Sequence, residues 1–134
     1  MKTRPAAMSV LAALYSVLTI GCAPSAQVTV ELRRDEKGVL LNVGLPKENR
    51  LLQITVRDAN LQTLWDVETR YCELRTFVYG VLDASSSCTC VQLFPPTGMP
   101  PKLVTGTTVI VEIGYSYDDP IPSAGTFRTK AVVP

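Results

Sequence analysis

Residues 108–117 read Thr-Val-Ile-Val-Glu-Ile-Gly-Tyr-Ser-Tyr, and this stretch decides the fold class of the chain. Every second residue from Val109 to Tyr117 is apolar or aromatic, while most of the residues between them are polar or small. Residues two apart on a β-strand point to the same face of a sheet, so this alternation predicts a strand with one buried face.

The same period of two recurs along the chain from residue 28 onward. Six further segments show strand patterns between turn residues: 28–33, 39–45, 52–56, 61–67, 70–82 and 127–133. We expect the fifth of these to bend at Gly80. Residues 89–94 are a further candidate for a short strand, inside a long connection. About seven strands in even succession predict an all-β fold, a seven-stranded antiparallel β-sandwich.

The first 21 residues differ from this pattern. Lys2 and Arg4 precede an apolar run from Ala6 to Ile20, which is the order of a secretion signal. The run is shorter than the roughly 20 residues that span a bilayer. We therefore expect a signal peptide (1–21), which precedes a short tether and a β-sandwich domain (28–134).

The end of this segment, Leu18-Thr19-Ile20-Gly21-Cys22, resembles the lipobox of bacterial lipoproteins, with Thr19 where that family usually has Leu. The resemblance implies that residues 22–27 are a lipidated cysteine with a short tether, and that the acylated Cys22 attaches the protein to the lipid bilayer of the cell envelope. Ala23 replaces the Asp that tends to retain such proteins at the inner membrane. This implies the periplasmic face of the outer membrane if the host is diderm. Ordinary secretion and an uncleaved anchor are the alternatives.

A second resemblance concerns the domain. The run from Leu52 to Val67, with Asp58 and Trp65, resembles the middle strands of fibronectin-III-like and immunoglobulin-like sandwiches. Small bacterial lipoproteins of uncharacterised function with such domains also carry a Tyr-Gly pair, then a proline-rich loop and a Leu-x-x-Gly turn. Here these features are residues 79–80, 95–101 and 103–106. The resemblance covers most of residues 28–133 and implies a fold without a specific activity.

Charge and composition narrow the classes of function. The chain has 13 basic and 12 acidic residues. Loss of Lys2 and Arg4 with the signal would leave a net charge of −1 in the mature chain. This balance predicts no nucleic-acid interface. The chain has no histidine, which removes the commonest general base and the usual partner of a serine or cysteine nucleophile. We expect no enzyme activity and no cofactor.

Three cysteines remain besides Cys22: Cys72, Cys88 and Cys90. An exported chain meets an oxidising compartment, so we expect one disulfide from Cys72 to either Cys88 or Cys90. A Cys88–Cys90 bond is the less favourable alternative, because neighbours on one strand face are poorly placed for disulfide geometry. The third thiol is a shielded cysteine, pairs with another molecule or acts in redox chemistry. A chain without a disulfide is the remaining alternative. Cysteines with one intervening residue and no histidine predict no metal site.

The connection from Asp83 to Gly106 is the candidate for partner binding, since loops of this length are commonly functional. A simple crossing between sheets is the alternative. Its candidate contact residues are an aromatic and four prolines: Phe94, Pro95, Pro96, Pro100 and Pro101. We expect a non-catalytic binding or scaffold module that holds an envelope protein near the membrane. The rivals are a carbohydrate- or peptidoglycan-binding module that uses tyrosines (Tyr71, Tyr79, Tyr115 and Tyr117) and a thiol-redox protein.

Overall fold

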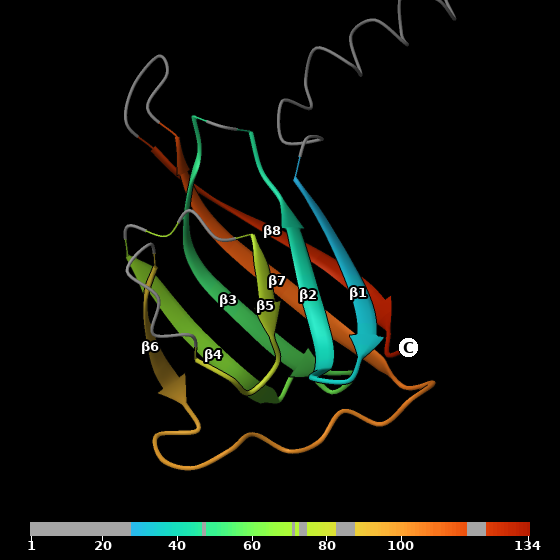
Figure 1. The fold of residues 1–134 in the computed structure, drawn as a ribbon. Helices are drawn as coiled ribbons and strands as arrows, with labels where there is room; N and C mark the ends of the chain where they lie inside the picture. Colours follow the sequence, from blue (N-terminus) through green and yellow to red (C-terminus); the bar gives the residue numbers. More distant parts are fainter. Residues whose placement is uncertain (1–27, 47, 71, 73–74, 83–87, 118–122) are drawn as a thin grey trace, which may run out of the picture.

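A computed structural model describes residues 28–46, 48–70, 72, 75–82, 88–117 and 123–134. In this part of the chain, eight strands form two antiparallel sheets that face each other (Figure 1). The strands are β1 (Thr29–Asp35), β2 (Gly38–Gly44), β3 (Arg50–Asp58), β4 (Thr63–Arg70), β5 (Thr76–Val78), β6 (Thr89–Phe94), β7 (Thr108–Tyr117) and β8 (Ser123–Val132). The predicted all-β class with two sheets is confirmed, whereas the predicted number of seven strands is wrong.

The strands are shared unequally between the sheets. The smaller sheet has the order β1-β2-β5, and the larger has the order β6-β4-β3-β7-β8. The additional strand is β6, which pairs with β4 at an edge of the larger sheet. It corresponds to the candidate segment 89–94, which the sequence did not count among its seven strands.

The bounds of β5 and β8 depart most from the prediction. Within the expected strand 70–82, Arg70 is the last residue of β4, and Thr76–Val78 form β5, which pairs with β2 before the chain turns at Tyr79 and Gly80. Residues 71 and 73–74 lie outside the described residues. β8 begins at Ser123, four residues before the expected start at Phe127. Small residues hide this part of the strand from the apolar pattern. One of them, Gly125, has a reason to be small, since a Cβ there would lie 2.7 Å from the Tyr115 ring.

The core lies between the inner faces of the two sheets. The alternation of residues 108–117 is confirmed, because Val109, Val111 and Ile113 are buried there. Trp65 on β4 is the largest fully buried side chain, with 1% of its surface exposed. The smaller sheet contributes Leu41 from β2. Apolar burial from both sheets is the main stabilising term in a sandwich of this size.

The directions of the strands place the start of β1 and the connection from β6 to β7 at opposite ends of the sandwich. β1 starts at the upper end in Figure 1, whereas β6 ends and β7 begins at the lower end. The described residues contain no helix long and apolar enough to cross a membrane. The expected signal peptide (1–21), Cys22 and the tether (22–27) lie outside the described residues.

Candidate functional site

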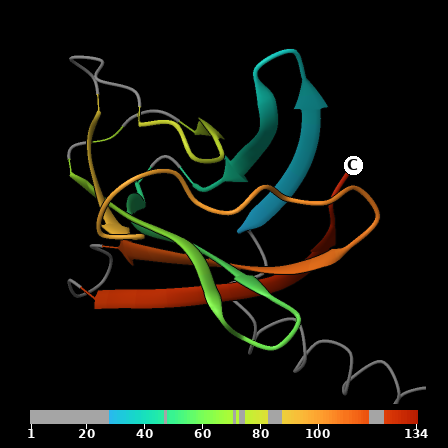
Figure 2. The same ribbon diagram turned by 90° about the horizontal axis from the view of Figure 1, so that it is seen from below.

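The proline-rich loop, residues 94–102, crosses the lower end of the sandwich between the two sheets (Figure 2). It begins at the last residue of β6 and continues towards β7. Its exposed side chains include Phe94 (41% exposed) and Met99 (77% exposed). The loop therefore presents apolar groups to solvent at one end of the domain.

Gln92 on β6 holds this loop in place. Its Nε2 donates hydrogen bonds to the carbonyl oxygens of Pro95 (2.9 Å) and Gly98 (3.0 Å). Its Oε1 accepts a hydrogen bond from Nε1 of Trp65 at 3.0 Å. One side chain thus links the most buried aromatic residue of the core to two backbone groups of the loop.

Tyr79, just after β5, makes a second attachment. Its hydroxyl donates a hydrogen bond to the carbonyl oxygen of Pro101 at 2.7 Å. Its ring packs edge-on against Trp65, with 5.4 Å between ring centroids and 66° between the planes. Burial raises the pKa of Tyr79 to about 12, because the surroundings disfavour the phenolate. The hydroxyl therefore remains a donor at neutral pH.

Gly80 allows the loop to approach this turn. It has a positive φ of 80°, which side-chain-bearing residues adopt at a cost. A Cβ at this position would lie 3.1 Å from Cγ of Pro100, which is itself buried. The Tyr-Gly pair noted in the sequence therefore supports the loop through one hydroxyl and one close backbone approach.

The predicted contact residues do not share one environment. Phe94, Pro96 and Pro101 are exposed, Pro95 is half-buried, and Pro100 is buried beneath the turn at Gly80. Met99 is the most exposed large apolar residue among those described, and the sequence analysis missed it. The sequence around Met99 offers one indication of this exposure: Met99 stands between Gly98 and a pair of prolines, so it cannot be part of a strand.

The cysteines gather at the opposite end of β6. A disulfide joins Cys72 to Cys88, as the expectation of a bond from Cys72 required. Sγ of Cys90 lies 3.1 Å from Sγ of Cys88, and all three sulfur atoms lie within 4.8 Å of one another. The sequence left open whether Cys88 or Cys90 pairs with Cys72, and the fold selects Cys88 and places Cys90 beside the bond.

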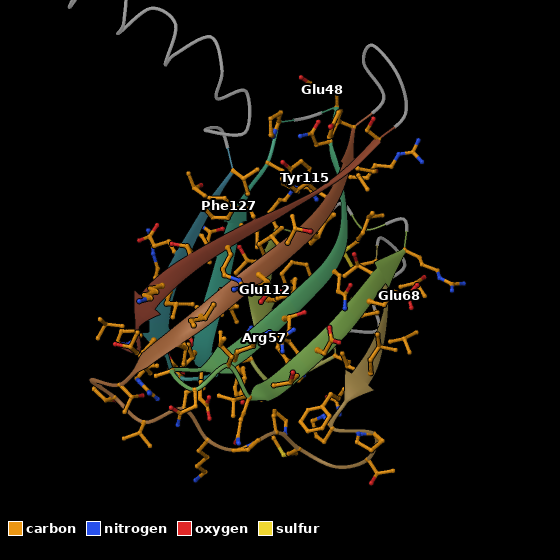
Figure 3. The ribbon with its side chains drawn as sticks, turned by 180° about the vertical axis from the view of Figure 1, so that it is seen from behind. Glu48, Arg57, Glu68, Glu112, Tyr115 and Phe127 are labelled. Atoms are coloured by element: carbon orange, nitrogen blue, oxygen red, sulfur yellow. A yellow bond between two sulfur atoms is a disulfide. The ribbon has the colours of Figure 1, made fainter. Side chains whose placement is uncertain are left out.

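The outer face of the larger sheet carries a polar network (Figure 3). Oε1 of Glu112 accepts from Nε of Arg57 at 2.9 Å and from Arg128 at 2.7 Å. Oδ1 of Asp66 accepts from Gln53 (2.7 Å) and Thr55 (3.0 Å). Both carboxylates accept hydrogen bonds from side chains on neighbouring strands, so this network holds the strands of the larger sheet together.

Of the tyrosines that a carbohydrate platform would use, Tyr115 and Tyr117 lie side by side, with 6.1 Å between their ring centroids. Tyr115 is buried, with 7% of its surface exposed, and Tyr79 is engaged by the proline-rich loop. Tyr71 lies outside the described residues.

No protein-family model, curated protein or solved structure matches this chain. The chemistry of the chain's own residues is therefore the basis for a function.

Proposed function

We propose that the chain is a lipid-anchored β-sandwich module of the cell envelope that binds another envelope protein through its proline-rich loop and performs no catalysis. The observation that carries this proposal is the attachment of the loop. Side chains of Gln92 and Tyr79 hold three of its carbonyl oxygens, while Phe94 and Met99 remain exposed. Exposed apolar groups on a preorganised loop lose little entropy on binding, which favours association.

The position of the loop supports the same role. The described chain starts at the upper end of the sandwich, and the loop lies at the lower end (Figure 1). With Cys22 acylated, residues 22–27 would reach at most about 20 Å and would hold the upper end near the bilayer. The loop would then face away from the membrane, towards partners whose encounters the anchor makes more frequent.

The strand order supports an immunoglobulin-like or fibronectin-III-like relationship, which is part of this proposal. The order β1-β2-β5 corresponds to strands A-B-E of such sandwiches, and β8-β7-β3 corresponds to G-F-C. β4 and β6 occupy the places of the two further strands that variable-type domains add to this sheet. β6 follows β5 in the chain, which departs from the order of those domains.

Site-directed photo-crosslinking tests the proposed contact. A photoreactive residue at Met99 of the full chain, expressed in its own cell envelope, should yield a discrete crosslinked protein. The matched control places the same residue at Thr126, which is exposed on β8. Phe94→Ser, which changes an exposed side chain of the loop, should weaken the crosslink at Met99 without unfolding the sandwich. The same partners recovered at Thr126, or an undiminished crosslink in the Phe94→Ser variant, would contradict the role of the loop.

The anchor needs a separate experiment. Metabolic labelling with palmitate should mark the natural chain, and Cys22→Ser should lose the label and move to the soluble fraction. An unlabelled natural chain that nevertheless crosslinks through Met99 would refute the lipid anchor alone. This outcome distinguishes the location of the protein from its binding surface.

A further inference from the structure

The three cysteine sulfur atoms form a cluster where β6 begins, at the end of the domain opposite the proline-rich loop. Two are joined as Cys72–Cys88, and the sulfur of Cys90 contacts the Cys88 sulfur at 3.1 Å. We propose that this cluster is a thiol–disulfide exchange site, in which Cys88 bonds alternately to Cys72 and Cys90. This inference is independent of the proposed partner binding.

The pairing of β4 with β6 creates the cluster. Cys90 lies opposite Thr69, and Thr89 lies opposite Arg70, the last residue of β4. Cys88 and Cys90 are two residues apart, so both side chains point to the same face. Cys72 follows two residues after the end of β4 and reaches Cys88. The register therefore places a third sulfur beside the central atom of the existing bond.

The exchange step needs no external oxidant or reductant. The Cys90 thiol loses its proton to solvent, and the thiolate attacks Sγ of Cys88. A Cys88–Cys90 bond forms while the Cys72–Cys88 bond breaks, and the electron pair leaves on Sγ of Cys72. The Cys72 thiolate then takes a proton from solvent. Cys72, Cys88 and Cys90 together hold one disulfide and one thiol before and after the step.

The two bonded forms differ in what they tie together. The Cys72–Cys88 bond spans 16 positions and fastens the segment after β4 to the start of β6, whereas a Cys88–Cys90 bond lies within β6. The longer loop and the unfavourable geometry of neighbouring cysteines keep Cys72–Cys88 as the resting form. Cys72 and Cys88 are buried, and Cys90 is half-buried. Exchange therefore moves the bond towards the sulfur that small external thiols reach most easily.

Trapping with N-ethylmaleimide tests the exchange in the folded, air-oxidised full chain. Trypsin separates the cysteines, because Cys72 lies in peptide 71–75 and both other cysteines lie in peptide 76–102. The chain is first held at about pH 8.5, where an ordinary thiol is half ionised, and is then labelled rapidly with excess N-ethylmaleimide, so that Cys72 takes up label in the molecules that hold the Cys88–Cys90 bond. We expect at least tenfold more label on Cys72 than in Cys90→Ser. Equal labelling of Cys72 in both chains would overturn the proposal.

A second variant tests the alternative bond directly. Cys72→Ser should retain the β-sheet circular dichroism spectrum and form a Cys88–Cys90 disulfide, so that peptide 76–102 takes up no N-ethylmaleimide until it is reduced. Two labelled cysteines in that peptide of a folded chain would contradict the exchange site. Because neither readout involves a partner or a membrane, failure here leaves the proposed function untouched.

Discussion

The indole Nε1 of Trp65 and the side-chain amide of Gln92 are joined by a hydrogen bond of 3.0 Å between β4 and β6. The indole is only a donor, so it must meet Oε1 of the amide. The amide nitrogen then points away, towards the carbonyl oxygens of Pro95 and Gly98, which are only acceptors. A core tryptophan thus determines the orientation of the group that holds the proline-rich loop.

Replacement of Gln92 should release the loop. Gln92→Met retains the length of the side chain but removes all three hydrogen bonds and leaves a buried indole donor without an acceptor. We expect the free energy of unfolding to fall by about 2 kcal/mol. Hydrogen–deuterium exchange should rise in residues 95–102. The control is Gln62→Met in the exposed β3–β4 turn, where the described hydrogen bonds are made by the backbone. Equal effects of both variants would contradict the proposed role of Gln92.

Substitution of two glycines with the same positive φ should distinguish the stability cost of backbone strain from the cost of disturbed loop packing. Gly80 and Gly98 both have φ of 80°, but only Gly80 faces a close neighbour, Pro100. Gly98→Ala should cost about 1 kcal/mol of stability, from the backbone alone. Gly80→Ala should cost about 2–3 kcal/mol, because the new methyl group also displaces Pro100. Urea denaturation of both variants measures the difference, and equal losses would show that the loop does not depend on this contact.

Neutralisation of Glu112 should weaken the larger sheet. The side chain is 14% exposed and joins Arg57 of β3 to Arg128 of β8. We expect Glu112→Gln to lower the free energy of unfolding by about 1–2 kcal/mol, with a smaller loss in high salt because Arg128 is largely exposed. Glu31→Gln is the matched control, since its ion pair with Arg33 lies in solvent and should contribute less than about 0.5 kcal/mol. A salt-independent loss would point to packing in place of charge.

Alkaline pH should report on the attachment made by Tyr79. Its pKa is about 12 in the folded chain and about 10 when unfolded, because burial disfavours the phenolate. The unfolded chain therefore loses this proton first, so the stabilisation is complete below pH 10 and declines as the pH rises towards 12. Absorbance at the tyrosinate band should show a late-titrating component that Tyr79→Phe removes. Below pH 10, this variant should be about 1 kcal/mol less stable, through loss of the bond to Pro101.

The sequence predicted the parts of the fold that obey a local period. Alternation along residues 108–117 identified a long strand and its buried face. β6 follows the inverse pattern, which explains why it was not counted. Its apolar Val91 and Leu93 face solvent, whereas the less apolar Cys90 and Gln92 point towards the interior. The inward orientation of a polar residue cannot be predicted from its neighbours in sequence when its hydrogen-bond partners come from a distant strand and from a loop.

The sequence by itself determined the all-β class, the face of the longest strand that is buried, the turns and the participation of Cys72 in a disulfide. These properties depend on the chemistry of neighbouring residues and on a two-residue period, which are visible in one dimension. Only the tertiary structure decided the choice of Cys88, the closeness of the third sulfur and the support of the loop by Trp65, Gln92 and Tyr79. Those contacts depend on how β4 aligns with β6 and on how the two sheets stack, and both are set by the packing of the whole core.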